Sequence, residues 1–132
     1  MKARRVWSAP VAVAALLGIL AIGTAVARDA RVVALQVSPA TLQLGLDQGG
    51  RVTAHVDIQL SEVATSTVKM NGVPATSCFA DTLGQLVAKF PETAIENTVS
   101  PGTALMTLEG ATKAGVPFVG QCTVRVTVNK GK

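Results

Sequence analysis

Aromatic residues are scarce in this chain, and histidine and cysteine are scarcer still. There is no tyrosine, one tryptophan (Trp7), three phenylalanines, one histidine and two cysteines. Sugar-binding faces usually stack the ligand on Trp or Tyr, which combine an apolar face with a polar tip. Single-stranded nucleic acid is held by aromatic stacking beside clustered cations. The composition therefore argues against both carbohydrate and nucleic acid as partners.

The single histidine also limits catalysis. Any Ser-His-Asp or Cys-His mechanism would have to use His55, and the eight acidic residues fall singly, without the carboxylate pair that glycosidases need. We therefore predict that the chain is not an enzyme and has no catalytic residue and no cofactor. His55 and Asp57 leave open a small metal- or ligand-binding face, although a catalytic zinc site typically takes three protein ligands.

The only long hydrophobic run lies near the start of the chain. A positive head (Lys2, Arg4 and Arg5) precedes an apolar stretch from Val11 to Gly23, and Ala25-Val26-Ala27 supplies small residues of the kind that signal peptidase accepts. This order predicts a signal peptide over residues 1–27, cleaved so that the mature chain begins at Arg28. An uncleaved membrane anchor and a twin-arginine export signal are the alternatives. We expect no membrane span after cleavage.

Most of the net positive charge belongs to that leader. The whole chain has a formal charge of +4, but three of its twelve basic residues lie in the head and none of its eight acidic residues does. Residues 28–132 therefore have a net charge of only +1. Export also places Cys78 and Cys122 in an oxidising compartment, where an even pair of cysteines predicts a disulfide. Two buried free thiols, or a metal pair that includes His55, are the alternatives.

The clearest secondary-structure signal is the stretch from Arg51 to Leu60. Val52, Ala54, Val56, Ile58 and Leu60 alternate strictly with polar residues, which is typical of a β-strand with one buried face. Such alternation fits an antiparallel sheet that is covered on one side. Residues 121–128 repeat the pattern, with Cys122, Val124, Val126 and Val128 facing one way, so these two strands are predicted to be central.

Shorter strands separated by Gly, Pro and Asn turns fill the rest of residues 28–132. Pro39 interrupts the first strand, as expected for an edge strand that moves from one sheet to the other. We predict a crossing loop over residues 61–67 and a short strand over 67–70 that ends at the Asn71-Gly72 turn. Leu86, Ala88 and Phe90 are expected to face inward, and Pro91 to begin a single helical turn. The backbone edges of strands 31–37 and 67–70 are the candidates for binding a partner strand.

About seven short strands without a long helical period predict an all-β fold, an antiparallel sandwich forming one domain over residues 28–132. An up-and-down barrel is the structural alternative. Phe79, Phe90 and Phe118 are expected to pack in the core or at its rim rather than to form a binding platform.

Several segments together resemble a known family. They are Pro39–Leu44, Ile58–Leu60, Leu86–Phe90, Leu108–Gly110, Gly115–Gly120 and Val124–Val126. They are similar to a type of immunoglobulin-like module found in secreted bacterial and archaeal proteins. The resemblance implies an exported, non-catalytic structural or protein-interaction module, periplasmic or extracellular, whose partner is an exported or cell-surface protein.

Overall fold

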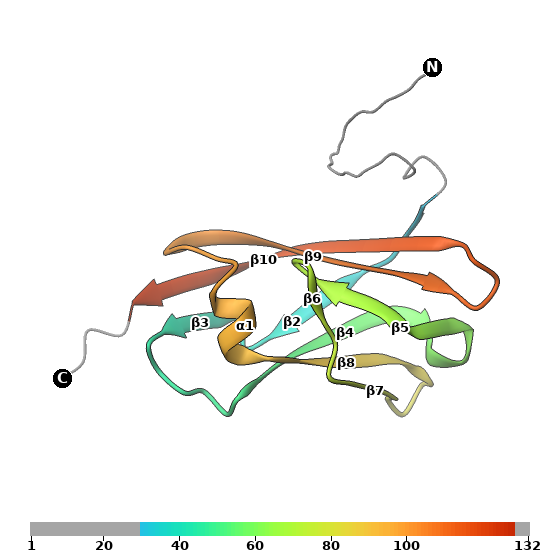
Figure 1. Cartoon of the computed structure of the whole chain (residues 1–132), viewed down its shortest axis with the longest axis horizontal. Helices are drawn as coiled ribbons and strands as arrows, with labels where there is room; N and C mark the ends of the chain where they lie inside the picture. Colours follow the sequence, from blue (N-terminus) through green and yellow to red (C-terminus); the bar gives the residue numbers. More distant parts are fainter. Residues whose placement is uncertain (1–29, 129–132) are drawn as a thin grey trace, which may run out of the picture. The chain divides into compact units, whose positions relative to one another are not determined.

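The computed structural model describes residues 30–128, and the chain divides into two units between Arg31 and Val32. Strands make up most of the described residues (Figure 1). The strands are β1 (Arg31–Val32), β2 (Leu35–Ser38), β3 (Thr41–Leu44), β4 (Arg51–Gln59), β5 (Val63–Met70), β6 (Val73–Pro74), β7 (Ser77–Ala80), β8 (Gln85–Pro91), β9 (Gly102–Thr112) and β10 (Pro117–Val128). A 3-10 turn, η3 (Leu60–Glu62), and one short helix, α1 (Glu92–Glu96), complete the set. The all-β prediction is confirmed.

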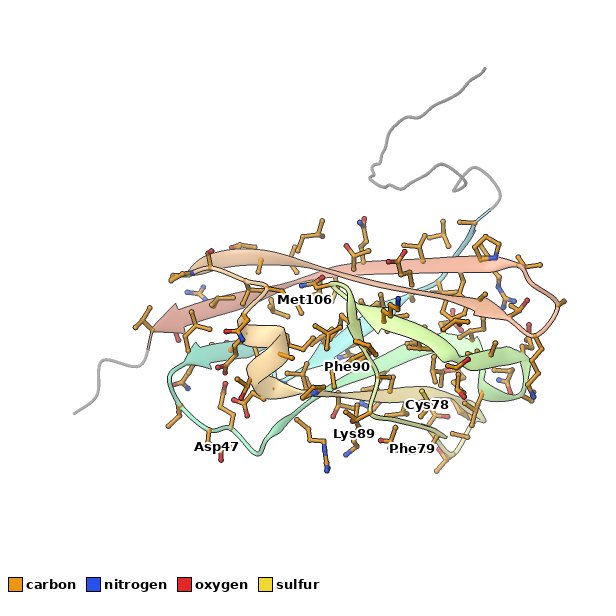
Figure 2. The ribbon with its side chains drawn as sticks, in the orientation of Figure 1. Asp47, Cys78, Phe79, Lys89, Phe90 and Met106 are labelled. Carbon is orange, nitrogen blue, oxygen red and sulfur yellow. The ribbon has the colours of Figure 1, made fainter. Side chains whose placement is uncertain are left out.

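The strands form two sheets that share one hydrophobic core. The six-stranded sheet has the order β1-β10-β9-β5-β6, with β3 also paired to β10, and the four-stranded sheet has the order β2-β4-β8-β7. Phe90 from one sheet and Met106 from the other lie in the core between the sheets, both with 0% exposure (Figure 2). Strand β3 pairs parallel with β10, whereas β10 with β9, β2 with β4, β4 with β8, β5 with β6, β5 with β9 and β7 with β8 are antiparallel.

Strand β4 lies where its alternation predicts. Its burial pattern switches between exposed and buried at almost every residue, with Val56 2% exposed and His55 on the outer face. It lies between β2 and β8 in the four-stranded sheet, while β10 lies between β1 and β9 in the other. The two cleanest sequence alternations thus mark one interior strand in each sheet.

The chain changes from one sheet to the other at Pro39, as the sequence predicts. Strand β2 pairs antiparallel with β4 in the four-stranded sheet, and after the cis Ser38–Pro39 peptide bond β3 pairs parallel with β10 in the six-stranded sheet. Because proline cannot donate a ladder hydrogen bond, the chain leaves one sheet there and joins the other. Pro39 thus separates β2 from β3, and the chain also changes sheet once before it, between β1 and β2.

The predicted crossing loop over residues 61–67 is wrong. Residues 63–70 form β5, whose register against β9 shifts between Ala64 and Lys69. The extra residues form a bulge, in which the Thr67 hydroxyl donates to the Ala64 carbonyl (2.6 Å) and accepts the Ala111 N–H (2.8 Å). A bulge breaks the period of two, so the sequence there shows no alternation.

The turn that ends β5 is as predicted. Asn71 and Gly72 both have positive φ, 51° and 83°, as a two-residue hairpin turn requires. However, residues 67–70 do not form an edge strand, because β5 lies between β9 and the two-residue β6. Strand β2, by contrast, is an edge of its sheet.

Candidate functional site

The outer face of the four-stranded sheet brings together several side chains that are far apart in the sequence. The register aligns Gln36 of β2 with His55 of β4, His55 with Val87 of β8, and Val87 with Phe79 of β7. These four residues form a row across the sheet on the face that points away from the core. We call this face, with the neighbouring Lys89 and Asp57, the outer patch.

Val87 is the unexpected member of the outer patch. It is only 2% exposed although it does not belong to the core cluster between the sheets. Its neighbours on the outer face therefore cover it. The sequence carries a signal of this, since Leu86, Val87 and Ala88 are apolar in succession, and a strand that is buried on both faces loses its alternation.

Phe79 lies at the rim of the patch and is 43% exposed, whereas Phe90 and Phe118 are buried in the core. The Lys89 ammonium lies 5.7 Å from the centre of the Phe79 ring, within cation–π range. Figure 2 shows Phe79 and Lys89 together at β7 and β8, apart from Phe90 and Met106 in the core. The expectation of core or rim packing holds for all three phenylalanines, but Phe79 also presents an open aromatic surface beside a cation.

His55 and Asp57 occupy the outer face of β4, as the alternation predicts, and both are exposed. The Gln85 amide donates to one Asp57 carboxylate oxygen at 3.1 Å, so that oxygen already has a hydrogen-bond partner. Among residues 30–128, no three His, Cys, Asp or Glu side chains are grouped to hold a metal ion. The pair alone supplies fewer than the three protein ligands of a catalytic zinc site.

The predicted disulfide is wrong, because Cys78 and Cys122 are free thiols. Cys78 lies on β7 at one edge of the four-stranded sheet, while Cys122 lies on β10 of the other sheet and has a hydrogen bond with the backbone of Val37, on the opposite edge strand β2. Both side chains are half-buried against the core. Burial raises the pKa of both thiols, and the Val37 hydrogen bond acts in the opposite, smaller sense at Cys122.

A second group of hydrogen-bonded residues, which no local sequence pattern indicates, covers the free edge of β3. The Gln48 side chain accepts the Gln43 N–H (2.8 Å) and donates to the Thr41 carbonyl (3.1 Å). The Ala40 carbonyl accepts the Arg125 N–H of β10. Because backbone groups alternate in direction along a strand, those of residues 41 and 43 point away from β10. The Gln48 amide thus takes the place of a neighbouring strand, and we call this contact the Gln48 cap.

Glu92 of α1 holds the Gln48 cap in place. Its buried carboxylate, 5% exposed, accepts the Gln48 N–H (3.0 and 3.1 Å) and the Gly50 N–H (2.9 Å). The neighbouring Glu96 has one buried carboxylate oxygen without a hydrogen-bond partner. Burial first, then a hydrogen bond with Glu92 and the negative charges of Glu92 and Asp47, raise the pKa of the Glu96 carboxyl.

The signal-peptide positions Ala25, Ala27 and Arg28 lie outside the described residues. Over the part of the chain that is described, no helix is long and apolar enough to cross a membrane.

No family model, curated protein or solved structure matches the chain.

Proposed function

We propose that the chain is an exported, non-catalytic module of the immunoglobulin-like type, which binds a protein partner through the β7 edge and the adjoining outer patch. The single observation that carries this proposal is that β7 is an open edge strand. It has a neighbouring strand on the β8 side only, among the strands of residues 30–128, and it presents the half-exposed Phe79 beside it. An open strand edge provides main-chain hydrogen bonds for a partner strand, and adjacent side chains provide specificity.

The strand order supports the immunoglobulin-like part of the proposal. In such domains strands A, B, E and D form one sheet and C, F and G form the other. Here β2-β4-β8-β7 corresponds to A-B-E-D, and β5-β9-β10 corresponds to C-F-G. The additional strand β3 continues strand A into the second sheet.

The outer patch supports a protein partner. Interface centres are enriched in aromatic residues and depleted in charged ones, with polar residues around them. The covered Val87, with Phe79 beside it at the rim, gives the patch an apolar part, and His55, Lys89 and Asp57 are polar members around it.

A capture experiment tests this function. The full chain, expressed with its own leader and a C-terminal affinity tag, is compared with a Phe79→Lys variant after cross-linking in the exported fraction. We expect a specific partner that the Phe79→Lys variant loses. The matched control is Leu105→Lys, which changes a 55% exposed apolar residue on the outer face of the other sheet and should retain the partner. Equal capture by wild type and both variants would place the partner elsewhere and end the proposal for this edge.

Export is tested separately by amino-terminal sequencing of the same purified protein. The expected first residue is Arg28, with the protein in the periplasmic or extracellular fraction. An intact Met1 in the membrane fraction would support an uncleaved anchor instead.

A further inference from the structure

Nearly every strand edge of the described sheets has a feature that discourages pairing with another chain. Pro39 ends β2, the two-residue β6 contains Pro74, and the Gln48 cap covers β3. The open stretch of β5 carries the bulge that Thr67 closes. Proline, short strands, bulges and covering groups are the usual ways in which proteins protect sheet edges.

Strand β7 is also short, with four residues, but it contains no proline, no bulge and no covering side chain among residues 30–128. Its four residues, Ser77 to Ala80, include no charge and no proline, and three of the four are exposed. The Asp81 N–H donates to the Gln85 carbonyl (2.9 Å), so residue 81 faces β8. By the alternation of an antiparallel ladder residues 77 and 79 also face β8, and the N–H and C=O groups of Cys78 and Ala80 point outward. Within the described part of the chain this edge is therefore uncharged, has no neighbouring strand on its outer side and is able to accept one.

We propose that β7 pairs antiparallel with β7 of a second copy of this chain, centred on Phe79. This inference rests on the proposed function and names the partner of the same edge. The two four-stranded sheets become one continuous sheet of eight strands about a two-fold axis. Cys78 and Ala80 of each copy exchange backbone hydrogen bonds with Ala80 and Cys78 of the other.

The side chains around β7 fit this symmetric register. Phe79 lies directly opposite Phe79 of the second copy as a pair without hydrogen bonds to each other, which brings the two rings together on the outer face. The absence of charge within β7 means that no like charges meet at the axis.

The register also brings opposite charges together. Ser77, which pairs with Lys89 in its own sheet, lies opposite Asp81 of the second copy. Lys89 and that aspartate are then two strands apart, about 10 Å between their Cα atoms. The Asp81 Oδ1 accepts the Leu83 and Gln85 N–H groups of its own turn, which leaves Oδ2 for the lysine. The two-fold axis repeats this charge pair, which favours a second copy over an unrelated neutral strand.

Cysteine cross-linking tests the register directly. In the full chain with Cys78→Ala and Cys122→Ala, Phe79→Cys places the two new thiols opposite each other. Ser77→Cys, the matched control on the same strand and face, places its thiols about 13 Å apart along the strands. Under mild oxidation Phe79→Cys should form a covalent dimer at least tenfold faster than Ser77→Cys. Equal rates, or no dimer from either, would overturn the pairing.

Sedimentation of the wild-type protein over a range of concentrations supplies the second test. We expect a monomer–dimer equilibrium that Ala80→Pro abolishes, because proline removes an outward N–H, while the melting temperature stays unchanged. A wild-type protein that remains monomeric at millimolar concentration overturns the inference. If the capture experiment then still recovers a different protein that Phe79→Lys loses, the proposed function stands without self-pairing; if both fail, both are wrong.

Discussion

The edges of β3 and β7 differ in how the chain treats an unpaired strand. At β3 a side-chain amide replaces the missing neighbour, and a buried carboxylate from a helix fixes that amide in place. At β7, among residues 30–128, no strand or side-chain amide covers the outward backbone groups, and an aromatic ring lies beside them. The comparison shows that the chain satisfies the outward backbone groups of one edge strand internally and leaves those of the other available to a partner strand.

Removing Glu92 should have the largest effect on this contrast. Glu92→Ala deletes the acceptor of the Gln48 and Gly50 N–H groups, leaves those part-buried donors without a partner, and releases the Gln48 cap. We expect a loss of about 3 kcal/mol in the free energy of unfolding, measured by urea denaturation. Glu109→Ala, an exposed acid on β9, is the control and should change stability by less than about 0.5 kcal/mol. Equal effects would mean that the carboxylate does not stabilise the β3 edge.

Removing the cap itself should have the next largest effect. Gln48→Ala leaves the outward groups of residues 41 and 43 to water and should cost about 1–2 kcal/mol. It should also turn β3 into a second open edge, so that larger oligomers appear in sedimentation. Gln121→Ala, an exposed glutamine on β10, should change neither property. A Gln48→Ala protein with wild-type stability and association would remove the distinction between the two edges.

On the outer patch beside β7, truncating the covered Val87 should lower stability more than truncating its polar neighbour His55. Val87→Ala removes a side chain that is 2% exposed and should cost about 1 kcal/mol through lost burial. His55→Ala, on the same face, should change stability by no more than about 0.5 kcal/mol. Thermal melts of the two variants give the comparison, and the reverse order of costs would contradict the described packing of the outer patch.

The smallest expected effect is a pH dependence at the β3 side. Because the folded-state pKa of Glu96 is raised, its protonated form stabilises the fold at low pH, and this contribution is lost as the pH rises from the ordinary value of 4.5 through the raised value. Glu92 and Asp47 are the charged groups that face it. Glu96→Gln keeps a donor at every pH and should flatten the decline in stability above pH 4.5, measured by melts in matched buffers. An unchanged decline would assign the pH dependence to other groups.

Local patterns in the sequence predict the local structure well. The alternation in β4 fixes which side chains enter the core, Pro39 predicts the change of sheet, and Asn71-Gly72 predicts its turn because only a few residues tolerate positive φ. Each of these features depends on residues that are close together in the chain.

The features that the sequence did not predict join distant segments. Glu92 and Gln48 are 44 residues apart, and nothing in either local pattern indicates that one accepts a hydrogen bond from the other. The cysteine prediction fails for the same reason. Two cysteines in an exported chain favour a disulfide, but the Cα atoms must lie within about 7 Å. The strand order, which places Cys78 on the edge strand β7 and Cys122 beside the opposite edge strand β2, is decided by the whole fold.

The parallel pairing of β3 with β10 has a mechanical consequence. Four residue pairs, from Thr41 with Arg125 to Leu44 with Val128, align the two strands in one direction. A pull on the chain before β3 and after β10 then acts at opposite ends of this pair, along the strand axis. The hydrogen bonds between the strands are loaded together, in shear, instead of opening one after another. Separating the two strands along their axis therefore requires breaking these hydrogen bonds at the same time.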